Sequence, residues 1–175
     1  MAAKRALVLG GTGMLAGCTA RLVADGWHVV LPSRRHAPLA TDLPTGAGRA
    51  LWVEADWSDP AALADRAARA LGGPADLLIA WVHGDARVPM LTAVEPLLAP
   101  GAPVVEVHGT PDGTAPVLRD HPTQHVVLGV VSYAGRTRWL TAEEITTGVL
   151  DGVRRALNGR TPAVQHLGEG RARAS

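Results

Sequence analysis

Short apolar runs alternate with helix-compatible segments along most of the chain. The apolar runs, such as HVVL, LLIAWV, PVVEV and VVLGVV, are nearly continuous and do not alternate with polar residues. Continuous apolar strands are expected when helices cover both faces of a parallel sheet. The pattern predicts six strands, at residues 6–9, 27–31, 50–54, 76–82, 103–107 and 125–131.

The segments between these strands suit crossover helices. In AALADRAARAL, for example, Leu63, Ala67 and Leu71 fall on one stripe at helical spacing. Helices are predicted at residues 13–25, 60–71 and 88–98. The order βαβαβαβ predicts an α/β fold, a doubly wound and mainly parallel sheet of six or seven strands.

A further helix is predicted in TAEEITTGVLDGVRRAL. Thr141 and Glu144 have the spacing of a capping box at its start, and Gly159 stops it. Core packing is the expected role of its apolar face, and a dimer contact is the alternative. That face comprises Ile145, Val149, Val153 and Leu157.

The size and composition fit one globular domain. Of 175 residues, 47% are hydrophobic and 19% charged, so the chain is expected to fold as a single domain over residues 1–167. The remaining segment, residues 168–175 (GEGRARAS), lacks apolar content and is expected to be a disordered tail.

Charge and cysteine usage narrow the partners and the location. A formal net charge of +1 gives no general attraction to nucleic acid or to acidic membranes. A lone Cys18 excludes an internal disulfide, and no apolar stretch approaches the roughly 20 residues that span a bilayer. A cytoplasmic location is therefore expected. Lys4 is the only lysine among 17 basic residues, and this bias toward arginine, with abundant Ala, Gly and Pro, is typical of an actinobacterial genome.

The stretch LVLGGTGMLAG carries the first chemical signal. Gly10, Gly13 and Ala16 have the spacing G-x-x-G-x-x-A, directly after a strand and at the start of a helix. Glycines there allow a sharp turn and let a diphosphate approach backbone N–H groups at the positive end of the helix. A purely structural turn is the alternative, but the position inside a βαβ unit favours a dinucleotide site.

The end of the second predicted strand indicates which dinucleotide. An acidic residue would normally bind the adenosine ribose there, but the sequence offers Ser33, Arg34 and Arg35. Hydroxyl and guanidinium donors suit a 2′-phosphate, so NADP is favoured over NAD, with solvated arginines as the alternative. After the third strand, Asp56 could accept a hydrogen bond from the adenine amino group, with Trp57 closing over the base. Helix capping by Ser58 or Asp59 explains part of that cluster equally well.

Together, LVLGGTGMLAG, SRR and the Asp56-Trp57 pair resemble the nucleotide half of the short-chain dehydrogenase/reductase superfamily, particularly its atypical members. The resemblance covers residues 5–110 best. It implies the strand order 3-2-1-4-5-6 and an NADP(H) cofactor whose nicotinamide lies over the carboxyl ends of strands four and five. Trp81, at the end of strand four, would border the nicotinamide and narrow the substrate pocket, unless it is simply buried. The cofactor residues so predicted are Gly10, Thr12, Gly13, Met14, Leu15, Ser33, Arg34, Arg35, Asp56, Trp57 and Trp81.

The catalytic signature of that superfamily is absent from the sequence. Main-line members use Tyr-x-x-x-Lys, in which the lysine lowers the pKa of the tyrosine. Here the only tyrosine, Tyr133, is followed at the lysine position by Thr137. Lys4 precedes the first strand and so belongs at the amino edge of the sheet, away from the cofactor.

Other polar residues follow predicted strands and are expected to meet at the carboxyl edge. His83, His108 and Tyr133 are candidate proton donors, while Arg136 and Arg138 could hold a substrate carboxylate or phosphate. Structural hydrogen bonding is the alternative for each histidine, and solvation or helix capping for each arginine.

Metal and nucleic-acid sites are not predicted. Pro122 interrupts the H-x-x-x-H spacing of His121 and His125, and no nearby Cys or Glu completes a ligand set. The five tryptophans are scattered and not interleaved with basic residues.

The sequence therefore predicts a small NADPH-dependent reductase acting on a C=O, C=N or activated C=C group of a small molecule. A non-catalytic NADP-binding regulator or scaffold is the main alternative. A non-redox lyase or isomerase fits the fold but has no feature in its favour. A homo-oligomer is a further expectation, since small folds of this type often associate through a flat helical face.

Overall fold

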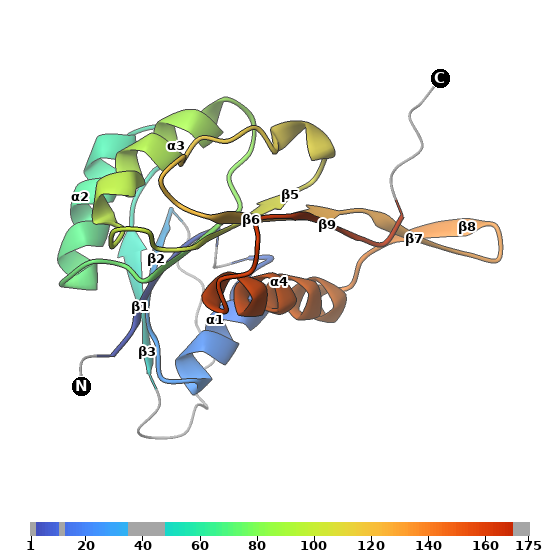
Figure 1. Ribbon diagram of the computed structural model, residues 1–175, viewed down its shortest axis with the longest axis horizontal. Helices are drawn as coiled ribbons and strands as arrows, with labels where there is room; N and C mark the ends of the chain where they lie inside the picture. The colour runs from blue at the N-terminus through green and yellow to red at the C-terminus, as the bar shows by residue number, and fades with distance from the viewer. Residues whose placement is uncertain (1–2, 11–12, 35–47, 170–175) are drawn as a thin grey trace.

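A parallel seven-stranded sheet forms the centre of the computed structural model, which describes residues 3–10, 13–34 and 48–169. The strand order is β3-β2-β1-β4-β5-β6-β9 (Figure 1). The predicted doubly wound fold and the order 3-2-1-4-5-6 are thus confirmed, with β9 added beside β6. The strands are β1 (Arg5–Leu9), β2 (His28–Ser33), β3 (Arg49–Glu54), β4 (Leu77–Ala80), β5 (Val104–His108), β6 (Thr123–Leu128) and β9 (Val164–Leu167).

Helices cover both faces of this sheet. The helices α1 (Ala16–Ala24) and α4 (Ala142–Leu157) lie on one face, and α2 (Pro60–Leu71) and α3 (Arg87–Val94) lie on the other (Figure 1). Three short 3-10 turns, Gly84–Ala86, Glu95–Leu97 and Pro111–Gly113, complete the connections. The predicted third helix is therefore shorter than expected, because Pro96 falls in a separate 3-10 turn.

Side chains of each central strand alternate between two apolar cores. Ile79 and Val105 pack in the core under α1 and α4, whereas Leu78 and Val104 pack in the core under α2 and α3. All four are fully buried. Burial of each such side chain stabilises the fold by about 1.5–3 kcal/mol, which explains the continuous apolar runs in the sequence.

The last helix is capped and packed as its sequence predicts. The Thr141 hydroxyl accepts from the Glu144 backbone N–H at 3.1 Å, and the Glu144 carboxylate accepts from the Thr141 N–H at 2.9 Å. Ile145, Val149 and Val153 are buried in the core of their own chain, so core packing is confirmed for these three residues. Leu157, the fourth residue of the predicted stripe, is exposed.

The predicted sixth strand is wrong at its C-terminal end. β6 stops at Leu128, and a separate antiparallel hairpin follows, formed by β7 (Val130–Tyr133) and β8 (Arg136–Trp139). A side chain at Gly129 would overlap the backbone of Glu169 and Leu167, so the chain turns out of the sheet there. The hairpin projects from the body of the molecule (Figure 1).

The segment expected to be a disordered tail begins with paired backbone. Glu169 and Val130 exchange hydrogen bonds, at 2.7 and 3.0 Å, across an antiparallel bridge. Gly168, with φ +72°, makes the turn into this bridge. The rest of the predicted tail, residues 170–175, lies outside the described residues.

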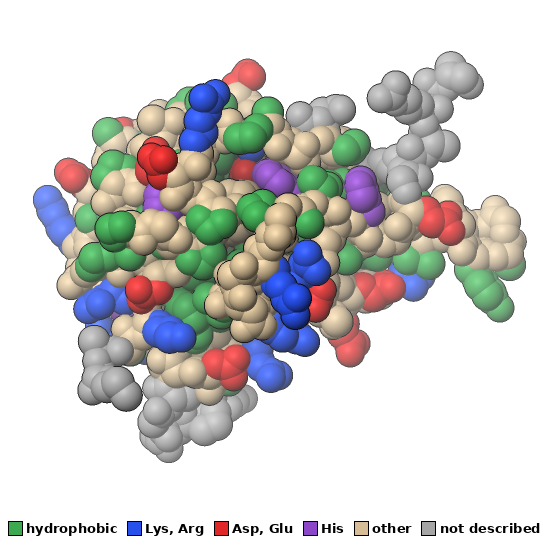
Figure 2. All heavy atoms as spheres, viewed as in Figure 1, with side chains coloured by type: hydrophobic (Ala, Val, Ile, Leu, Met, Phe, Trp, Pro, Cys, Tyr) green, Lys and Arg blue, Asp and Glu red, His purple; other side chains and the backbone are tan. Residues whose placement is uncertain are grey.

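The described surface mixes charges of both signs. Acidic and basic side chains are interspersed over the face shown in Figure 2. Among the described helices, none has the length and apolar character needed to cross a membrane.

Candidate functional site: a cleft at the carboxyl ends of β1 to β4

A cleft of about 410 Å³ opens where four parallel strands end. The turn after β1, the end of β2 and the segments after β3 and β4 each contribute to its wall. Its lining residues are Gly10, Gly13, Met14, Pro32, Ser33, Arg34, Trp57 and Trp81. Seven of the eleven cofactor residues predicted from sequence therefore meet in one place. Two others, Thr12 and Arg35, lie outside the described residues.

The glycines of the turn have different physical roles. Gly10 has φ +86°, and a Cβ there would lie 3.0 Å from the Trp81 Cβ and 3.2 Å from the Trp81 carbonyl oxygen. Only glycine fits that backbone conformation and that contact without strain. A Cβ at Gly13 would meet no described atom within 4 Å. Gly13 thus leaves room on the cleft side of the turn.

Helix α1 begins directly behind this turn. Leu15 precedes it, makes no side-chain cap, and is fully buried in the core. Its first turn holds no acidic side chain. The helix N-terminus therefore presents its positive dipole end toward the turn, which favours an anion. Any contact of Leu15 with a cofactor would come from its backbone, because its side chain is occupied in the core.

The carboxylate of Asp56 stands beside the cleft in a local turn. It accepts a hydrogen bond from the Ser58 backbone N–H at 2.9 Å. This hydrogen bond is the main cause of its lowered pKa, and the charge of Arg34 adds to it. The neighbouring Asp59 caps α2 by accepting from the Ala62 N–H at 3.2 Å, so the capping alternative is confirmed for Asp59. Asp56 remains ionised and exposed next to Arg34.

Trp81 bridges the cleft and the core. Its indole packs against the core under α1 and α4, and its far edge lies 3.6 Å from the position of a Cβ on Gly109, after β5. Trp81 therefore lines the cleft and is also partly buried. From the sequence alone, these two positions are alternatives. His83 is exposed and its ring lies 5.8 Å from the Trp81 ring, centroid to centroid.

His108 does not stand in the open cleft. It is buried, and its Nε2 lies 2.8 Å from Nδ1 of His125 on β6, in a hydrogen bond. Burial lowers the pKa of His108 to about 4, and burial likewise lowers the pKa of His125. Both imidazoles are neutral at physiological pH. The structure thus places His108, a proton donor predicted from the sequence, in a buried pair with His125 and not at the open cleft.

Beside the two histidines lies an ion pair that the sequence did not reveal. Arg87 donates to both carboxylate oxygens of Glu106, at 2.9 and 3.0 Å, and also to the Ala115 carbonyl at 2.7 Å. Glu106, His108 and His125 have ligand atoms within 4.8 Å of one another, a donor set that suits a transition metal. However, Arg87 already binds both oxygens of Glu106, and the imidazoles bind each other.

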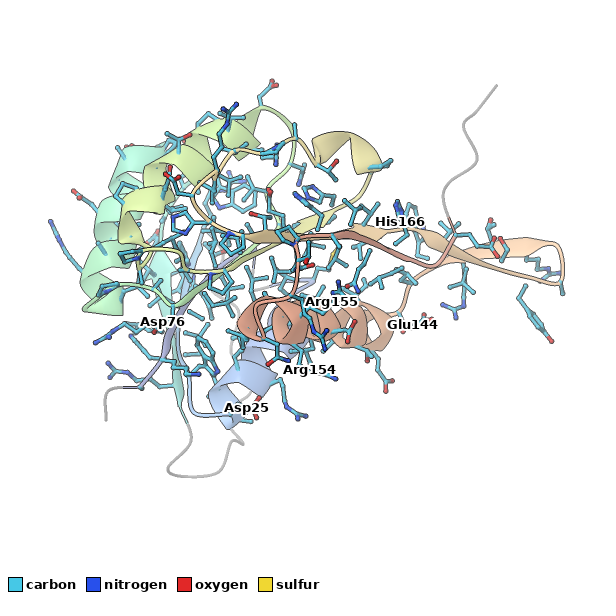
Figure 3. The ribbon with its side chains drawn as sticks, viewed as in Figure 1. Asp25, Asp76, Glu144, Arg154, Arg155 and His166 are labelled. Atoms are coloured by element: carbon cyan, nitrogen blue, oxygen red, sulfur yellow. The ribbon has the colours of Figure 1, made fainter. Side chains whose placement is uncertain are left out.

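Tyr133 and Arg136 lie on the projecting hairpin and not at the cleft. They form a cross-strand pair at its tip, and the Tyr133 side chain is 83% exposed. Arg138 donates to Glu144 at 2.7 Å, and this hydrogen bond raises the pKa of Arg138 and helps to lower that of Glu144 to about 2. Glu144 itself lies on α4 (Figure 3). Within a single chain, the predicted proton donor Tyr133 and the predicted substrate-binding residues Arg136 and Arg138 therefore do not line the cleft. Sequence could not place them because the hairpin interrupts the expected strand.

The structure also places Cys18 and the two histidines of the H-x-x-x-H spacing outside the cleft. Cys18 is buried, and burial raises the pKa of its thiol to about 12, so it serves the core. His121 and His125 have separate partners, because Nδ1 of His121 bonds the Ala102 carbonyl at 2.8 Å whereas His125 bonds His108.

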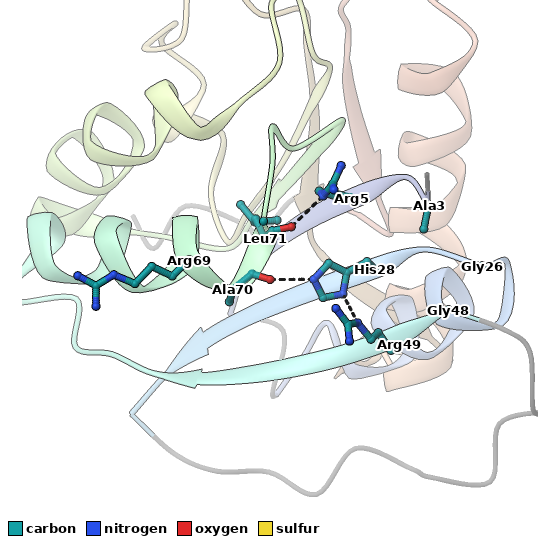
Figure 4. Close-up of a pocket in the computed structure, with 10 residues that line it drawn as sticks. Ala3, Arg5, Gly26, His28, Gly48, Arg49, Arg69, Ala70 and Leu71 are labelled. Atoms are coloured by element: carbon teal, nitrogen blue, oxygen red, sulfur yellow. Dashed lines mark hydrogen bonds between the residues drawn. The ribbon is translucent and has the colours of Figure 1, made fainter. Parts of the chain in front are cut away.

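A second cavity, of about 660 Å³, lies at the amino edge of the sheet (Figure 4). Arg5, His28 and Arg49 occupy paired positions on β1, β2 and β3. Arg5 donates to the Leu71 carbonyl at 2.8 Å, and His28 Nε2 bonds the Ala70 carbonyl at 2.9 Å. These basic groups thus satisfy the last carbonyls of α2 and face its negative end. Ligands of open α/β sheets bind at the opposite edge.

Comparison with known proteins supports the fold. No protein-family model and no curated protein matches the chain. Among solved structures, it is similar to a 3-oxoacyl-[acyl-carrier protein] reductase from Brucella melitensis, with TM-score 0.71 and 16% identity over 100% of this chain and 99% of that one. It is also similar to a variant of a short-chain dehydrogenase/reductase from Serratia marcescens, with TM-score 0.69 and 18% identity over 95% and 97%. A third is the NADH-dependent reductase A1-R′ complexed with NAD, with TM-score 0.68 and 16% identity over 94% of each chain. The chain therefore has the Rossmann α/β fold seen in short-chain dehydrogenase/reductases.

Proposed function

We propose that the chain is a small NADPH-dependent reductase that transfers hydride to a C=O, C=N or activated C=C group. The observation that carries this proposal is the cleft at the carboxyl ends of β1 to β4, where Gly10, Gly13, Ser33 and Arg34 line one cavity. That edge is where open α/β sheets bind nucleotides. The similar solved structures named as reductases, one of them complexed with NAD, support the same class.

The residues of the turn fit a diphosphate. Gly10 brings the backbone against Trp81, and Gly13 leaves open space above the N-terminus of α1. Backbone N–H groups at a helix N-terminus can donate to phosphate oxygens without a cationic side chain. This arrangement would hold the diphosphate at the floor of the cleft.

The opposite wall would select the adenosine end. Arg34 supplies guanidinium donors suited to a 2′-phosphate, and Ser33 supplies a hydroxyl. Trp57 lines the same wall and offers a flat face for the adenine ring, with the ionised Asp56 beside it. We therefore assign Arg34 as the main determinant of NADPH over NADH.

The reacting centre would lie toward Trp81 and His83. Bound NADPH would supply the hydride. The edge of the Trp81 indole lies 3.6 Å from the position of a Cβ on Gly109, so Trp81 would border the reacting centre on that side. His83, whose ring lies 5.8 Å from the ring of Trp81, would be the proton donor, because an imidazole can act as a general acid. An activated substrate such as an iminium needs little acid catalysis, because positioning alone supplies several kcal/mol.

The test is a substrate panel of ketones, imines and enones with NADPH, followed by loss of nicotinamide absorbance. The wild type is expected to reduce at least one class, and His83→Gln is expected to lower kcat about 10²-fold with unchanged NADPH affinity. Asp85→Asn, an exposed change on the same 3-10 turn, is the matched control and should keep full turnover. Equal kcat for His83→Gln and wild type would remove His83 from the mechanism.

A non-catalytic NADP-binding regulator is the second candidate. It is favoured by the removal of two predicted proton donors from the cleft, since His108 is sealed in the core and Tyr133 lies on the hairpin. Such a protein would bind NADPH as tightly as an enzyme and reduce no member of the panel. A small-molecule substrate and a cytoplasmic location belong to the enzyme proposal.

A further inference from the structure

The hairpin of β7 and β8, residues 130–139, is an arm that the rest of the described chain barely covers. It leaves the sheet at Gly129 and returns to α4 through Leu140. Ala134 and Gly135, with φ +50° and +76°, form the tight turn at its tip. An isolated two-stranded hairpin is at best marginally stable in water. An arm of this kind therefore needs a surface to pack on.

One face of the arm is turned toward α4. Residues directly opposite on paired strands share a face, and faces alternate along each strand. Val131 and Arg138 are one such pair, and Tyr133 and Arg136 are the pair two residues further out on the same face. Arg138 contacts Glu144, so this face is the one turned toward α4.

The helix α4 covers only the base of that face. Arg138 is held by Glu144, whereas Tyr133 remains 83% exposed. Within the described residues, Arg136 has no carboxylate partner. The outer half of the arm thus presents an aromatic ring and a guanidinium group to solvent.

A groove with apolar and acidic side chains, which would suit an aromatic ring and a guanidinium group, lies at the base of the arm. It measures about 480 Å³ and runs between the first turns of α4 and the end of β9. Leu140 and Leu167 provide apolar walls, and Glu143 and Glu144 provide carboxylates. Glu143 is exposed and, within the described part of the chain, is not in an ion pair.

We propose that the outer half of the arm docks into this groove on a second copy of the same chain. The Tyr133 ring would pack between Leu140 and Leu167, and Arg136 would pair with Glu143 of the second copy. The Arg138–Glu144 pair within one chain, at 2.7 Å, already shows an arginine of this face binding an acid of the same helix turn. The proposed pair of Arg136 with Glu143 of the second copy would be of the same kind, two residues further along β8.

The proposed contacts are also compatible with a closed dimer. Each chain carries the arm and, at its foot, the groove, so two copies related by a two-fold axis would make two identical contacts. The assembly is then complete, with no arm left over to recruit a third copy. This inference is independent of the proposed reductase activity.

The test is sedimentation equilibrium of the full chain at about 1–100 µM, a range that brackets the affinity expected of a modest interface. The wild type is expected to be a dimer at the upper concentrations. Tyr133→Ser and Arg136→Glu are each expected to weaken dimerisation at least tenfold. Arg160→Glu, an exposed arginine outside arm and groove, is the matched control and should sediment as the wild type does.

A charge exchange separates docking from simple misfolding. Arg136→Glu combined with Glu143→Arg is expected to restore the dimer, because the pair is re-formed with reversed signs. A wild type that is monomeric at about 100 µM would overturn the proposal. So would a dimer that persists unchanged in Arg136→Glu, or a double variant no better than the single one.

Discussion

Two regions of the same sheet differ in which polar side chains they leave available to a ligand. At the ends of β1 to β4, glycines, a helix N-terminus and Arg34 surround an open cleft. At β5 and β6, Arg87, Glu106, His108 and His125 are buried and bonded to one another. Topology brings polar residues to both places. Burial and existing partners decide which of them can meet a ligand.

The closed region is expected to contribute mainly to stability. Glu106→Ala would leave the buried Arg87 guanidinium without its carboxylate and lower the free energy of unfolding by about 3–5 kcal/mol, measured by urea denaturation. The paired change Arg87→Met with Glu106→Leu removes both charges and is expected to remain much closer to the wild type. If Glu106→Ala unfolds like the wild type, this network is not a stabilising unit.

The same region should make stability depend on pH. The pKa of His108 falls from 6.5 to about 4 on folding, so the unfolded chain binds a proton more readily than the folded chain between these values. The contribution of His108 to the free energy of unfolding is therefore fully present above about pH 6.5 and decreases by about 2–3 kcal/mol as the pH falls toward 4. Urea denaturation across this range tests it. His108→Leu should flatten part of the slope, and an equal slope in both proteins would contradict the assignment.

In the open region, substitution of Gly10 should mainly affect stability, whereas substitution of Gly13 should mainly affect NADPH binding. Gly10→Ala forces a side chain into a positive φ and against Trp81, which is expected to cost about 1–3 kcal/mol of unfolding free energy. Gly13→Ala meets no described atom, so its unfolding free energy should change by less than about 0.5 kcal/mol. Its methyl group points into cleft space, and NADPH affinity is expected to fall at least tenfold. Unchanged affinity in Gly13→Ala would place the diphosphate elsewhere.

The smallest expected effect concerns cofactor choice. Arg34→Ala should weaken NADPH about tenfold, roughly the value of one charge-assisted contact, and leave NADH affinity unchanged. Fluorescence titration with each nucleotide measures both. Arg66→Ala, a surface arginine that donates to the Glu54 carbonyl, is a suitable control for net charge. Parallel losses for both nucleotides would show that Arg34 does not contact the 2′-phosphate.

The sequence predicted the open region much better than the closed one, for physical reasons. Glycine spacing after a strand constrains the backbone locally, so Gly10 and Gly13 could be placed on the turn after the first strand without a structure. Whether His108 is free or bonded depends on His125, which is adjacent only through the pairing of β5 with β6. The sequence did not predict the hairpin because Ala134 occupies a left-handed turn position, where Asn or Gly is the usual residue.

The proposed function requires that the cleft at the ends of β1 to β4 binds NADPH. The most direct measurement is a titration of the purified chain with NADPH and, separately, with NADH, followed by tryptophan quenching and nicotinamide emission, since Trp57 and Trp81 line the cleft. We expect saturable binding with at least tenfold preference for NADPH. Absence of binding by either nucleotide would contradict it and reduce the glycine turn to a structural feature of the fold.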